Sequence, residues 1–203
     1  MDKSLSPKRI DCVIPAAGLS SRMGSWKLML PYQQHTILDA SIENTLSFCS
    51  RVILVVGYRR LELIEKYKDN ERILLVHNES YKQGMFSSIQ QGVKHVESDS
   101  FFITHGDMPC IPSSIFQQLW SARGSCTVFP GSPTRPGHPV LIPQRLKHTV
   151  MHADVKSSMK AILFSEQAKY LEMDVEEIYL DVDTPKAYKY LCQRSHQNYQ
   201  IDS

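Results

Sequence analysis

The residues best suited to chemistry on a polyphosphate lie in one glycine-containing segment near the N-terminus. Residues 15–27 read Pro-Ala-Ala-Gly-Leu-Ser-Ser-Arg-Met-Gly-Ser-Trp-Lys. The small residues allow the backbone to approach a ligand closely, and the backbone N–H groups of such turns bind anions. Arg22 and Lys27 add two cations, and no acidic residue occurs between Cys12 and Leu38. The segment therefore predicts a polyphosphate site, with a plain surface turn carrying two solvated cations as the alternative.

This segment does not match the common phosphate-binding loops. Its glycines are six residues apart and no Gly-Lys-Ser or Gly-Lys-Thr follows, which excludes a Walker A loop, and it lacks the GxGxxG dinucleotide fingerprint. It directly follows a predicted buried strand. We therefore expect it at the carboxyl end of a sheet, where open α/β folds bind their ligands.

The first candidate metal ligand is an aspartate in the middle of the chain. Asp107 stands in Thr-His-Gly-Asp-Met-Pro at 104–109, directly after an apolar run. An aspartate at this place projects into the same crevice as the glycine-containing loop. Carboxylate oxygens, completed by water and phosphate, are the ligands that Mg²⁺ prefers. A helix cap or a simple turn is the alternative role for Asp107.

The second acidic position is Leu-Asp-Val-Asp-Thr-Pro at 180–185. If this segment is a strand, alternation places Asp181 and Asp183 on one face. The same residues suit a helix N-terminus, with Asp183 or Thr184 as the cap and Pro185 in the first turn. The two roles are compatible, so the segment predicts both a metal ligand and the start of a helix.

Two further segments offer groups for recognising a base and an acceptor. His77–Ser88 leads from the third predicted strand into a helix, and its Gly84 and Ser88 provide a flexible turn and a hydroxyl. Backbone groups and hydroxyls can form hydrogen bonds with the polar edge of a bound ligand, while simple helix capping by Ser87 or Gly84 is an equal alternative. His138 lies in a loop between glycine and proline, where a histidine more often has a structural role.

Alternating strands and helices must position these candidates. Short runs that are apolar on both faces predict four buried strands, at Ile10–Pro15, Val52–Val56, Arg72–Val76 and Ser100–Thr104. Helical periodicity predicts helices at about Ile37–Cys49, Arg60–Lys68, Met85–Val96 and Ser113–Ala122. This order implies βαβ crossovers and a three-layer α/β/α fold with a central, mostly parallel sheet.

The second half of the chain is less regular. Its predicted elements are strands at Cys126–Phe129, Val140–Ile142 and Glu177–Leu180, helices near Lys156–Phe164 and Thr184–Leu191, and a turn-rich stretch at Pro130–Pro139. The polar segments 1–9 and 194–203 are expected to be poorly ordered. We expect one domain over 1–203, ordered over about 10–192, with a nucleotide-binding half at about 10–110 and an acceptor-binding half at about 111–192.

Composition excludes several classes of protein. The 203 residues are 42% hydrophobic and 22% charged, with a formal net charge of +2. This balance favours neither nucleic acid nor a membrane surface as a partner, and no apolar run reaches the ~20 residues of a membrane helix. The five cysteines are scattered without a CxxC pair, and the N-terminus lacks a secretory signal. We therefore expect a soluble, cytoplasmic protein with reduced thiols.

Together these motifs resemble those of the molybdenum cofactor nucleotidyltransferases, a family with a glycosyltransferase-A-like fold. Ala-Ala-Gly, Arg-Met-Gly and Lys27 fall in register with the family's AAGxSxRMGxxK signature, and Leu30-Pro31 follows. The resemblance extends over roughly residues 10–192 through THGDMP, GHPVL and DVDTP. The cytidylyltransferase branch is the most similar, because its guanylyltransferase relatives carry a Leu-Ala-Gly-Gly loop where this chain has Ala17.

The resemblance implies transfer of CMP from CTP to the terminal phosphate of molybdenum-molybdopterin, with Mg²⁺, or Mn²⁺ in its place. It implies metal ligation by Asp107 and Asp183, with Asp181 as the alternative, and catalytic roles for Lys27, Arg22 and Asp107. The residues implied to bind the nucleotide and the acceptor are Ala16, Ala17, Gly18, Leu19, Ser20, Ser21, Arg22, Gly84, Ser88, Gly137 and His138. The family's Gly-Asp-x-Gly-Ala-Arg stretch is replaced by residues 153–158, which leaves the acceptor contacts of that region open.

Other activities are compatible with the same residues. Within the fold, the nucleotide could be GTP, or the acceptor a sugar or alditol phosphate. From a different class, the chain could carry molybdenum cofactor without turnover, although the retention of Lys27, Asp107 and Asp183 together argues against a site that only binds. Transient contact with a recipient molybdoenzyme is expected, and contact with nucleic acid or a membrane is not.

Overall fold

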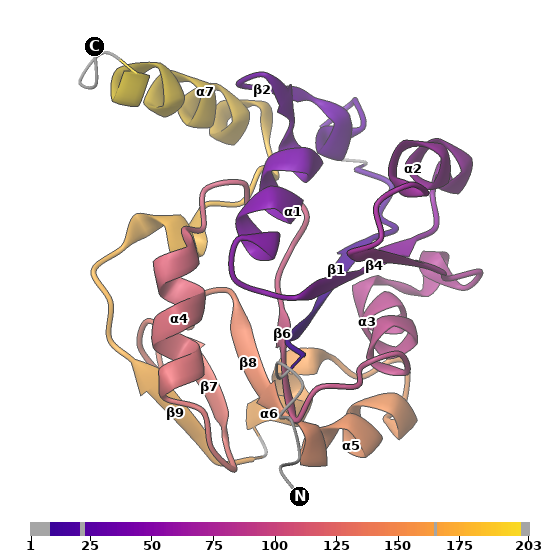
Figure 1. The fold of residues 1–203 in the computed structure, drawn as a ribbon, viewed down its shortest axis with the longest axis vertical. Coiled ribbons are helices and arrows are strands. Elements are labelled where there is room, and N and C mark those ends of the chain that lie inside the picture. The colour runs from indigo at the N-terminus through magenta and orange to yellow at the C-terminus, as the bar shows by residue number, and fades with distance from the viewer. Residues whose placement is uncertain (1–8, 21–22, 165, 200–203) are drawn as a thin grey trace, which may run out of the picture.

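A seven-stranded sheet forms the centre of the molecule, in the order β5-β4-β1-β6-β8-β7-β9 (Figure 1). The computed structural model describes residues 9–20, 23–164 and 166–199. The strands of the sheet are β1 (Asp11–Ala16), β4 (Arg51–Val56), β5 (Ile73–His77), β6 (Ser100–Ile103), β7 (Thr127–Pro130), β8 (Val140–Pro143) and β9 (Ala168–Leu171). A separate hairpin pairs β2 (Pro31–Tyr32) with β3 (His35–Thr36).

Most neighbouring strands run parallel, as predicted from their continuous apolar runs. β5, β4, β1 and β6 form a parallel block, in which Val13 of β1 lies opposite Ile53 of β4 and Ile103 of β6. β8 is antiparallel to both β6 and β7, and β9 is parallel to β7. Every residue of β4 is buried, because helices cover both faces of the sheet. The predicted mostly parallel sheet is confirmed.

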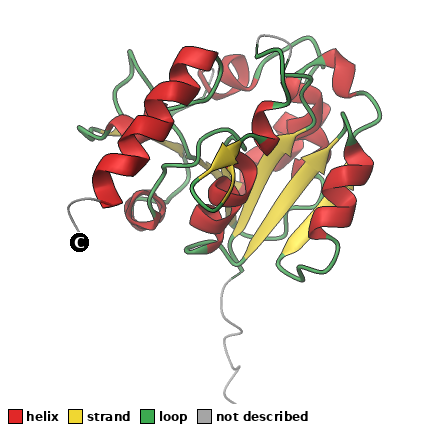
Figure 2. Cartoon of the chain, turned by 90° about the horizontal axis from the view of Figure 1, so that it is seen from above, coloured by secondary structure: helices red, strands yellow, loops and turns green. Residues whose placement is uncertain are grey.

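Helices pack on both faces of the sheet, which confirms the predicted three-layer arrangement (Figure 2). One face carries α1 (Ile37–Leu46), α2 (Arg60–Tyr67) and α4 (Ser113–Ser121), and the other carries α3 (Met85–Val93), α5 (Lys147–His152) and α6 (Met159–Phe164). The remaining helices are the short 3₁₀ turns η1 (Lys27–Met29), η2 (Tyr81–Gln83), η3 (Gln144–Leu146) and η4 (Glu176–Tyr179), and the final helix α7 (Pro185–Tyr199).

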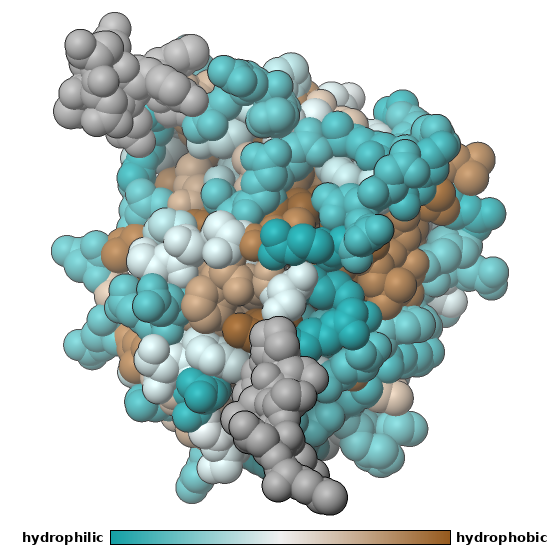
Figure 3. Space-filling view, in the orientation of Figure 1, coloured by the Kyte–Doolittle hydropathy of each residue, from teal (hydrophilic) through white to brown (hydrophobic). Residues whose placement is uncertain are grey.

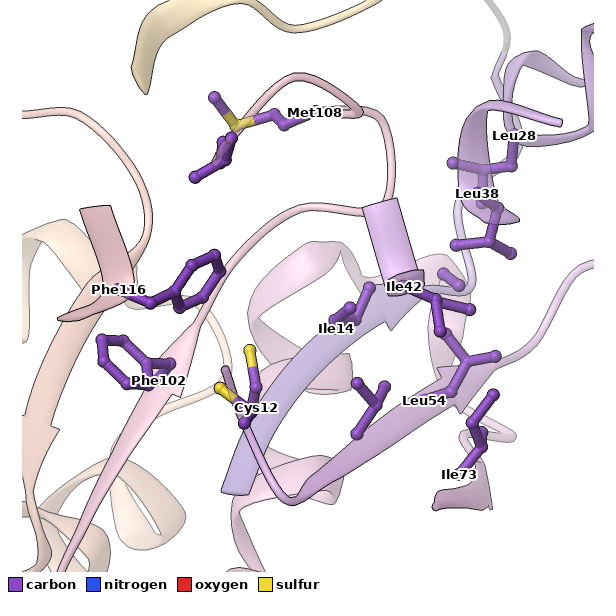
Figure 4. Packing of buried hydrophobic residues seen from close by; sticks show 14 of the residues in the cluster. Cys12, Ile14, Leu28, Leu38, Ile42, Leu54, Ile73, Phe102, Met108 and Phe116 are labelled. Atoms are coloured by element: carbon purple, nitrogen blue, oxygen red, sulfur yellow. The ribbon is translucent and has the colours of Figure 1, made fainter. Parts of the chain in front are cut away.

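The alternation of side chains along the strands divides the core into two apolar clusters. Cys12 and Ile14 of β1 point into the cluster beneath α1 and α4, whereas Val13 points to the α3 face. Figure 4 shows part of the first cluster, where Phe102 of β6 meets Phe116 of α4 edge-on with ring centroids 5.1 Å apart. The buried strands are therefore held from both sides, which makes their carboxyl ends a fixed platform.

The C-terminal helix is anchored to the β2–β3 hairpin, beside which it lies in Figure 1. Leu191 of α7 packs with Tyr32 and Val182, and the Tyr188 hydroxyl donates a hydrogen bond of 2.6 Å to the carbonyl of Pro31. Thr184 caps the helix, because its hydroxyl oxygen accepts from the backbone N–H of Ala187 at 3.1 Å. Of the two predicted caps, Thr184 is correct, and Pro185 occupies the first turn as expected.

The predicted strand at Glu177–Leu180 is wrong. Residues Glu176–Tyr179 form the 3₁₀ turn η4, and the acidic side chains of Glu176 and Glu177 pair with Arg194 of α7. The strand that pairs with β7 at the edge of the sheet is β9. The sequence did not predict β9, α5 or the β2–β3 hairpin. Side-chain contacts with α7, rather than a strand ladder, thus hold this segment.

The boundaries at the ends of the chain also differ from expectation. α7 continues to Tyr199, beyond the predicted helix end at Leu191, and the expectation that residues from 194 onward are poorly ordered stays a prediction. Residues 1–8 and 200–203 lie outside the described residues. No helix within the described ranges combines the length and the apolar character needed to cross a membrane. The face drawn in Figure 3 is hydrophilic over most of its area, with apolar side chains between the polar ones.

A buried ion pair closes the end of the sheet opposite to the carboxyl ends of its parallel strands. Asp11, which is fully buried, accepts hydrogen bonds from Arg51 Nε at 2.9 Å and Nη2 at 3.2 Å. The same carboxylate accepts from the backbone N–H groups of Glu97 at 2.7 Å and Ser98 at 3.2 Å. One side chain therefore ties β1 to β4 and to the turn that precedes β6.

We predict that Asp11→Ala lowers the free energy of unfolding by about 3–5 kcal/mol, because it leaves the buried Arg51 guanidinium without its principal partner. Glu97→Ala is the matched control, since Glu97 also contacts Arg51, at 3.4 Å, but its side chain is 59% exposed. An exposed pair of this kind contributes less than about 1 kcal/mol. Denaturation by guanidinium chloride measures both variants, and equal losses would contradict the assignment.

Candidate active site

A cleft of about 440 Å³ lies at the carboxyl ends of β1 and β6. The chain passes from β1 to β4 and β5 on one side, and then returns to place β6 on the other side of β1. Such a reversal opens a crevice between the loops that follow the two central strands. The loop after β1 and the Gly106–Asp107 turn after β6 both line the cleft, as the sequence predicted.

Lys27 joins the two predicted metal-binding aspartates. Its Nζ donates one hydrogen bond to Asp107 Oδ2 and another, of 2.6 Å, to Asp183 Oδ1. The three side chains are partly buried, with exposed fractions of 19% for Lys27, 11% for Asp107 and 29% for Asp183. The sequence analysis assigned Lys27 to phosphate, and did not predict that one ammonium bonds both carboxylates. Residues far apart in the chain thus converge on one point.

Backbone contacts hold these three side chains in place. The backbone N–H of Lys27 donates to Ser20 Oγ at 3.3 Å, which closes the loop after β1. The carbonyl of Asp107 accepts from the N–H of Val182 at 3.1 Å, which brings the segment before α7 beside the turn after β6. Because Thr184 caps α7, Asp183 lies directly before the helix, and it lines the cleft.

Charge in the cleft is balanced around Lys27. Partial burial disfavours its charged form, but the two carboxylates outweigh burial and raise the pKa of Lys27 above its ordinary value. The pKa of Asp181 is also raised, first by loss of water and then by repulsion from Asp107 and Asp183. Lys27 therefore stays cationic at neutral pH. Asp181 and Asp183 lie in a loop rather than on a strand, so the strand alternation considered for them does not apply.

The residues predicted to bind a nucleotide after β1 line the cleft where they are described. Ala16 and Ala17 are buried at its base, Gly18 and Leu19 are exposed at its rim, and Ser20 adopts a left-handed conformation with φ of 53°. Ser21 and Arg22 lie outside the described residues, so their predicted roles stay predictions.

The predicted base-recognition segment forms the opposite wall. Gly84 is the N-cap residue of α3, and its φ of 107° is accessible to glycine but strained for other residues. Ser88 is buried and lines the cleft with Gly84. Asn78, which the sequence analysis did not single out, donates at 2.9 Å to the hydroxyl oxygens of both Ser87 and Ser88. Capping by Gly84 and a place for Ser88 in the cleft are both correct.

Several other residues of the cleft were missed. Tyr81 and Lys82 of η2, Met85 at the start of α3 and His105 after β6 all line it. Tyr81, Lys82 and Met85 could have been predicted from their position in the segment around Gly84, of which only the serines and the glycine were considered. His105 directly precedes the Gly106–Asp107 turn, and its backbone position alone carries it to the cleft.

Gly137 and His138 do not line this cleft but lie next to it. A Cβ atom on Gly137 would stand 2.8 Å from the carbonyl oxygen of Ile178, so a glycine is needed there for packing. The ring of His138 lies against the ring of His105, with centroids 4.1 Å apart. His138 therefore contacts the site through His105.

The donor set suits a cation that takes only part of its ligands from protein. No group of three or more His, Cys, Asp or Glu side chains placed to hold a metal ion occurs among the described residues. The two carboxylates of Asp107 and Asp183 nevertheless meet at one cationic atom. One or two carboxylates, completed by water and phosphate, is the typical protein contribution to Mg²⁺. Asp107 does not cap α4, which begins after Pro112 without a side-chain cap.

Comparison with known proteins agrees with this geometry. Residues 12–170 match the family model of the MobA-like NTP transferase domain. The chain is 45% identical over 177 residues to the molybdenum cofactor cytidylyltransferase of Escherichia coli K12, covering 87% of this chain and 92% of that protein. It is 27% identical over 184 residues to a probable molybdenum cofactor guanylyltransferase of Methanosarcina mazei, covering 81% of each.

Solved structures share this fold. A nucleotidyl transferase from Methanothermobacter thermautotroptrophicus superposes with a TM-score of 0.81 at 20% sequence identity. The match covers 94% of this chain and 99% of that one.

We predict that Asp181→Asn stabilises the protein slightly at neutral pH and has no effect near pH 3. An aspartate whose pKa is raised on folding is penalised only when charged. The penalty is absent below its unfolded pKa of about 3.9 and complete above its folded pKa. Because Asp181 is exposed to solvent, the expected rise in Tm is only about 1 °C.

Thermal unfolding at pH 3, 5 and 7.5 measures this difference. Asp174→Asn, at an exposed aspartate in the segment between β9 and η4, is the matched control and should leave Tm unchanged at each pH. A lower Tm for Asp181→Asn at pH 7.5 would contradict the assigned repulsion.

Proposed function

The chain belongs to the MobA-like NTP transferase family, and we propose that it transfers CMP from CTP to the terminal phosphate of molybdenum-molybdopterin. The products are molybdopterin cytosine dinucleotide and pyrophosphate. The observation that carries the proposal is the convergence of Lys27, Asp107 and Asp183 in the cleft after β1 and β6. The 45% identity to a cytidylyltransferase supports the choice of substrates.

In this proposal the loop after β1 holds the triphosphate of CTP. Backbone N–H groups of the loop residues Ala17–Ser20 would bind the phosphates, and Lys27, which lines the same cleft, supplies a cation. Lys82 adds a second cation at the rim, and Arg22 completes the set predicted from the sequence. Ser88, held by Asn78, offers its hydroxyl to the cytosine edge beside Gly84.

The reaction needs positioning and charge neutralisation rather than a base. A phosphate monoester has its second pKa near 6, so the attacking phosphate is largely a dianion at neutral pH. Its oxygen bonds to the α-phosphorus of CTP while the bond from that phosphorus to the β-phosphate oxygen breaks, and pyrophosphate leaves. Lys27, cationic at neutral pH, neutralises charge that develops on the α-phosphate.

Asp107 and Asp183 would hold Mg²⁺, or Mn²⁺, in the complex with nucleotide. When bound, such an ion would supply positive charge that neutralises the phosphates. Lys27 occupies the position between the same two carboxylates. We therefore expect the Lys27 ammonium to leave the two carboxylates for the phosphates when the nucleotide binds, which would free both carboxylates for the ion.

The choice of cytosine rests on the loop after β1. Ala17 is buried, and its Cβ fills the space beside Gly57, where an added Cβ would stand 2.8 Å away. The guanylyltransferase-type loop with glycine at this place would lack that contact.

The proposal also includes an acceptor-binding role for the second half of the chain, a cytoplasmic location and transient contact with a recipient molybdoenzyme. Described thiols without disulfides agree with a reducing compartment.

Pyrophosphate release tests this function directly. We predict that the purified protein with Mg²⁺ and molybdenum cofactor releases pyrophosphate from CTP faster than from GTP, ATP or UTP. Reactions without the cofactor, and with sugar or alditol phosphates in its place, are the controls. A preference for GTP would contradict the base assignment. Release no faster than background with any nucleotide would favour a carrier that binds the cofactor without turnover.

We predict that Lys27→Met tightens the binding of Mn²⁺ in the absence of nucleotide, because the competing ammonium is removed. A partly exposed ion pair contributes about 1 kcal/mol, which corresponds to roughly fivefold in Kd. The same variant should slow single-turnover CMP transfer far more than it weakens CTP binding. Electron paramagnetic resonance of free Mn²⁺ measures the first effect. Lys82→Met, which removes a cation from the rim of the same cleft, is the control and should leave Mn²⁺ affinity unchanged.

An unchanged Mn²⁺ affinity in Lys27→Met would show that the lysine and the metal ion do not share these carboxylates. Asp107→Asn should abolish Mn²⁺ binding with or without Lys27, which separates the loss of a ligand from the loss of a competitor.

A further inference from the structure

Two histidines on consecutive turns of α5 lie face to face at the surface. His148 and His152 are both exposed, and the centroids of their rings are 4.0 Å apart with an angle of 25° between the ring planes. Side chains four residues apart in a helix project from the same face. Two imidazoles at this spacing on one helix face are a common arrangement for binding a transition-metal ion. The pair does not line the nucleotide cleft and has no part in the proposed reaction.

A backbone hydrogen bond orients the ring of His152. Its Nδ1 lies 2.9 Å from the carbonyl oxygen of His148, and because a carbonyl oxygen only accepts, Nδ1 carries the hydrogen and donates it. In a neutral imidazole of this form, the other nitrogen, Nε2, has the lone pair. Metal-binding histidines typically make such a bond, since it fixes both the direction of the ring and the nitrogen that faces the ion. His152 is therefore in the form that binds a metal ion through Nε2.

The helix that carries the pair is held to the body of the protein at both ends. Val150, between the two histidines, is fully buried, and the side-chain amide of Gln90 on α3 donates to the carbonyls of Val150 at 3.0 Å and Ala153 at 2.9 Å. At the start of α5, Lys147 Nζ donates to the carbonyl of Val96 at 2.6 Å. The backbone beneath the pair is thus ordered before any ion binds, which lowers the entropic cost of binding.

The chemistry of the pair decides which ions it favours. Imidazole nitrogens suit Zn²⁺ and Ni²⁺, whereas Mg²⁺ prefers oxygen ligands. Because no larger metal-binding group of His, Cys, Asp and Glu occurs in the described part of the chain, the two imidazoles would be the whole contribution of the protein. Water would fill the other coordination positions. The pair therefore differs in ion preference from the carboxylates of Asp107 and Asp183.

We propose that His148 and His152 form a second metal site, which binds Zn²⁺ through the Nε2 atoms of both rings. The site goes beyond the proposed function, because it lies outside the cleft and uses none of its residues. A bound ion links two turns of α5. It stabilises the folded protein, since the unfolded chain does not hold the two imidazoles together.

Calorimetric titration of the whole protein with Zn²⁺ at pH 7.5 tests the proposal. Excess Mg²⁺ is present, because it competes for the carboxylates of the cleft and not for imidazole. We expect His148→Gln and His152→Gln each to weaken Zn²⁺ binding by about tenfold or more. The double variant should bind almost as well as either single variant, because the first substitution already destroys the chelate. His35→Gln, at an exposed histidine of β3, is the matched control and should leave the affinity unchanged.

Two further measurements separate ligation from an effect on folding. Because both side chains are exposed, the single variants should unfold at the wild-type Tm without metal. Saturating Zn²⁺ should then raise the Tm of the wild type by several degrees and that of the variants by much less. Nitrogen-15 NMR of the imidazoles should show that Zn²⁺ shifts the Nε2 resonances of both His148 and His152.

Several outcomes would overturn the proposal. An unchanged Zn²⁺ affinity in either single variant would show that the two rings do not act as a pair. Loss of Zn²⁺ binding in Asp107→Asn would place the ion in the cleft instead. Wild-type protein that binds no Zn²⁺ up to millimolar concentration would also contradict it. None of these results depends on nucleotidyl transfer, which pyrophosphate release measures separately.

Discussion

The site depends on one cation shared by two carboxylates. Lys27 arrives from the loop after β1, Asp107 from the turn after β6 and Asp183 from the segment before α7. Without a positive charge between them, two partly buried carboxylates would repel one another. The bridging ammonium therefore acts with the backbone contacts to hold three distant segments together before any ligand arrives. It also defines, in the structure itself, a position that suits a cation.

The sheet explains why these segments meet. A parallel strand presents its following loop at one edge of the sheet, and β1 and β6 are neighbours although more than eighty residues separate them in the chain. The Asp11–Arg51 pair fixes the opposite end of β1, so that the loop after it starts from a rigid point. β8, which is antiparallel to both β6 and β7, continues the sheet past β6, and β7 and β8 supply Phe129, Val140 and Ile142 to the wall of a cavity beside the cleft.

Much of this architecture could be predicted because its central strands are apolar on both faces. The runs at Val52–Val56 and Ser100–Thr104 have few other stable environments, and the structure buries nearly all of their residues. β9 was missed because its four residues, Ala-Lys-Tyr-Leu, are only partly buried at the edge of the sheet and carry little apolar signal. Glu177–Leu180 looked like a strand by composition, but Arg194 of α7 pairs with Glu177, and such a distant contact leaves no local pattern.

In the site, too, the sequence reveals residue types but not contacts between distant residues. The aspartates and the glycine-containing loop, which line the cleft, were predicted from residue types that carry chemistry wherever they stand, and Ser88 from the resemblance to the family. Asn78 and His105 contribute through what they touch, and spacing in the chain does not reveal that. The lysine–aspartate bridge was missed for a related reason: a sequence gives the charges of Lys27 and Asp183 but not which of them meet in the absence of ligand.

The order of these groups along the chain has a consequence for biosynthesis. Asp183 and the helix that holds it follow all the strands of the described sheet. During translation the platform and the phosphate loop therefore emerge from the ribosome before the last carboxylate does. A partly synthesised chain would possess a folded sheet but an incomplete centre, so the ability to cleave a nucleoside triphosphate is acquired only once the acceptor side has also been made.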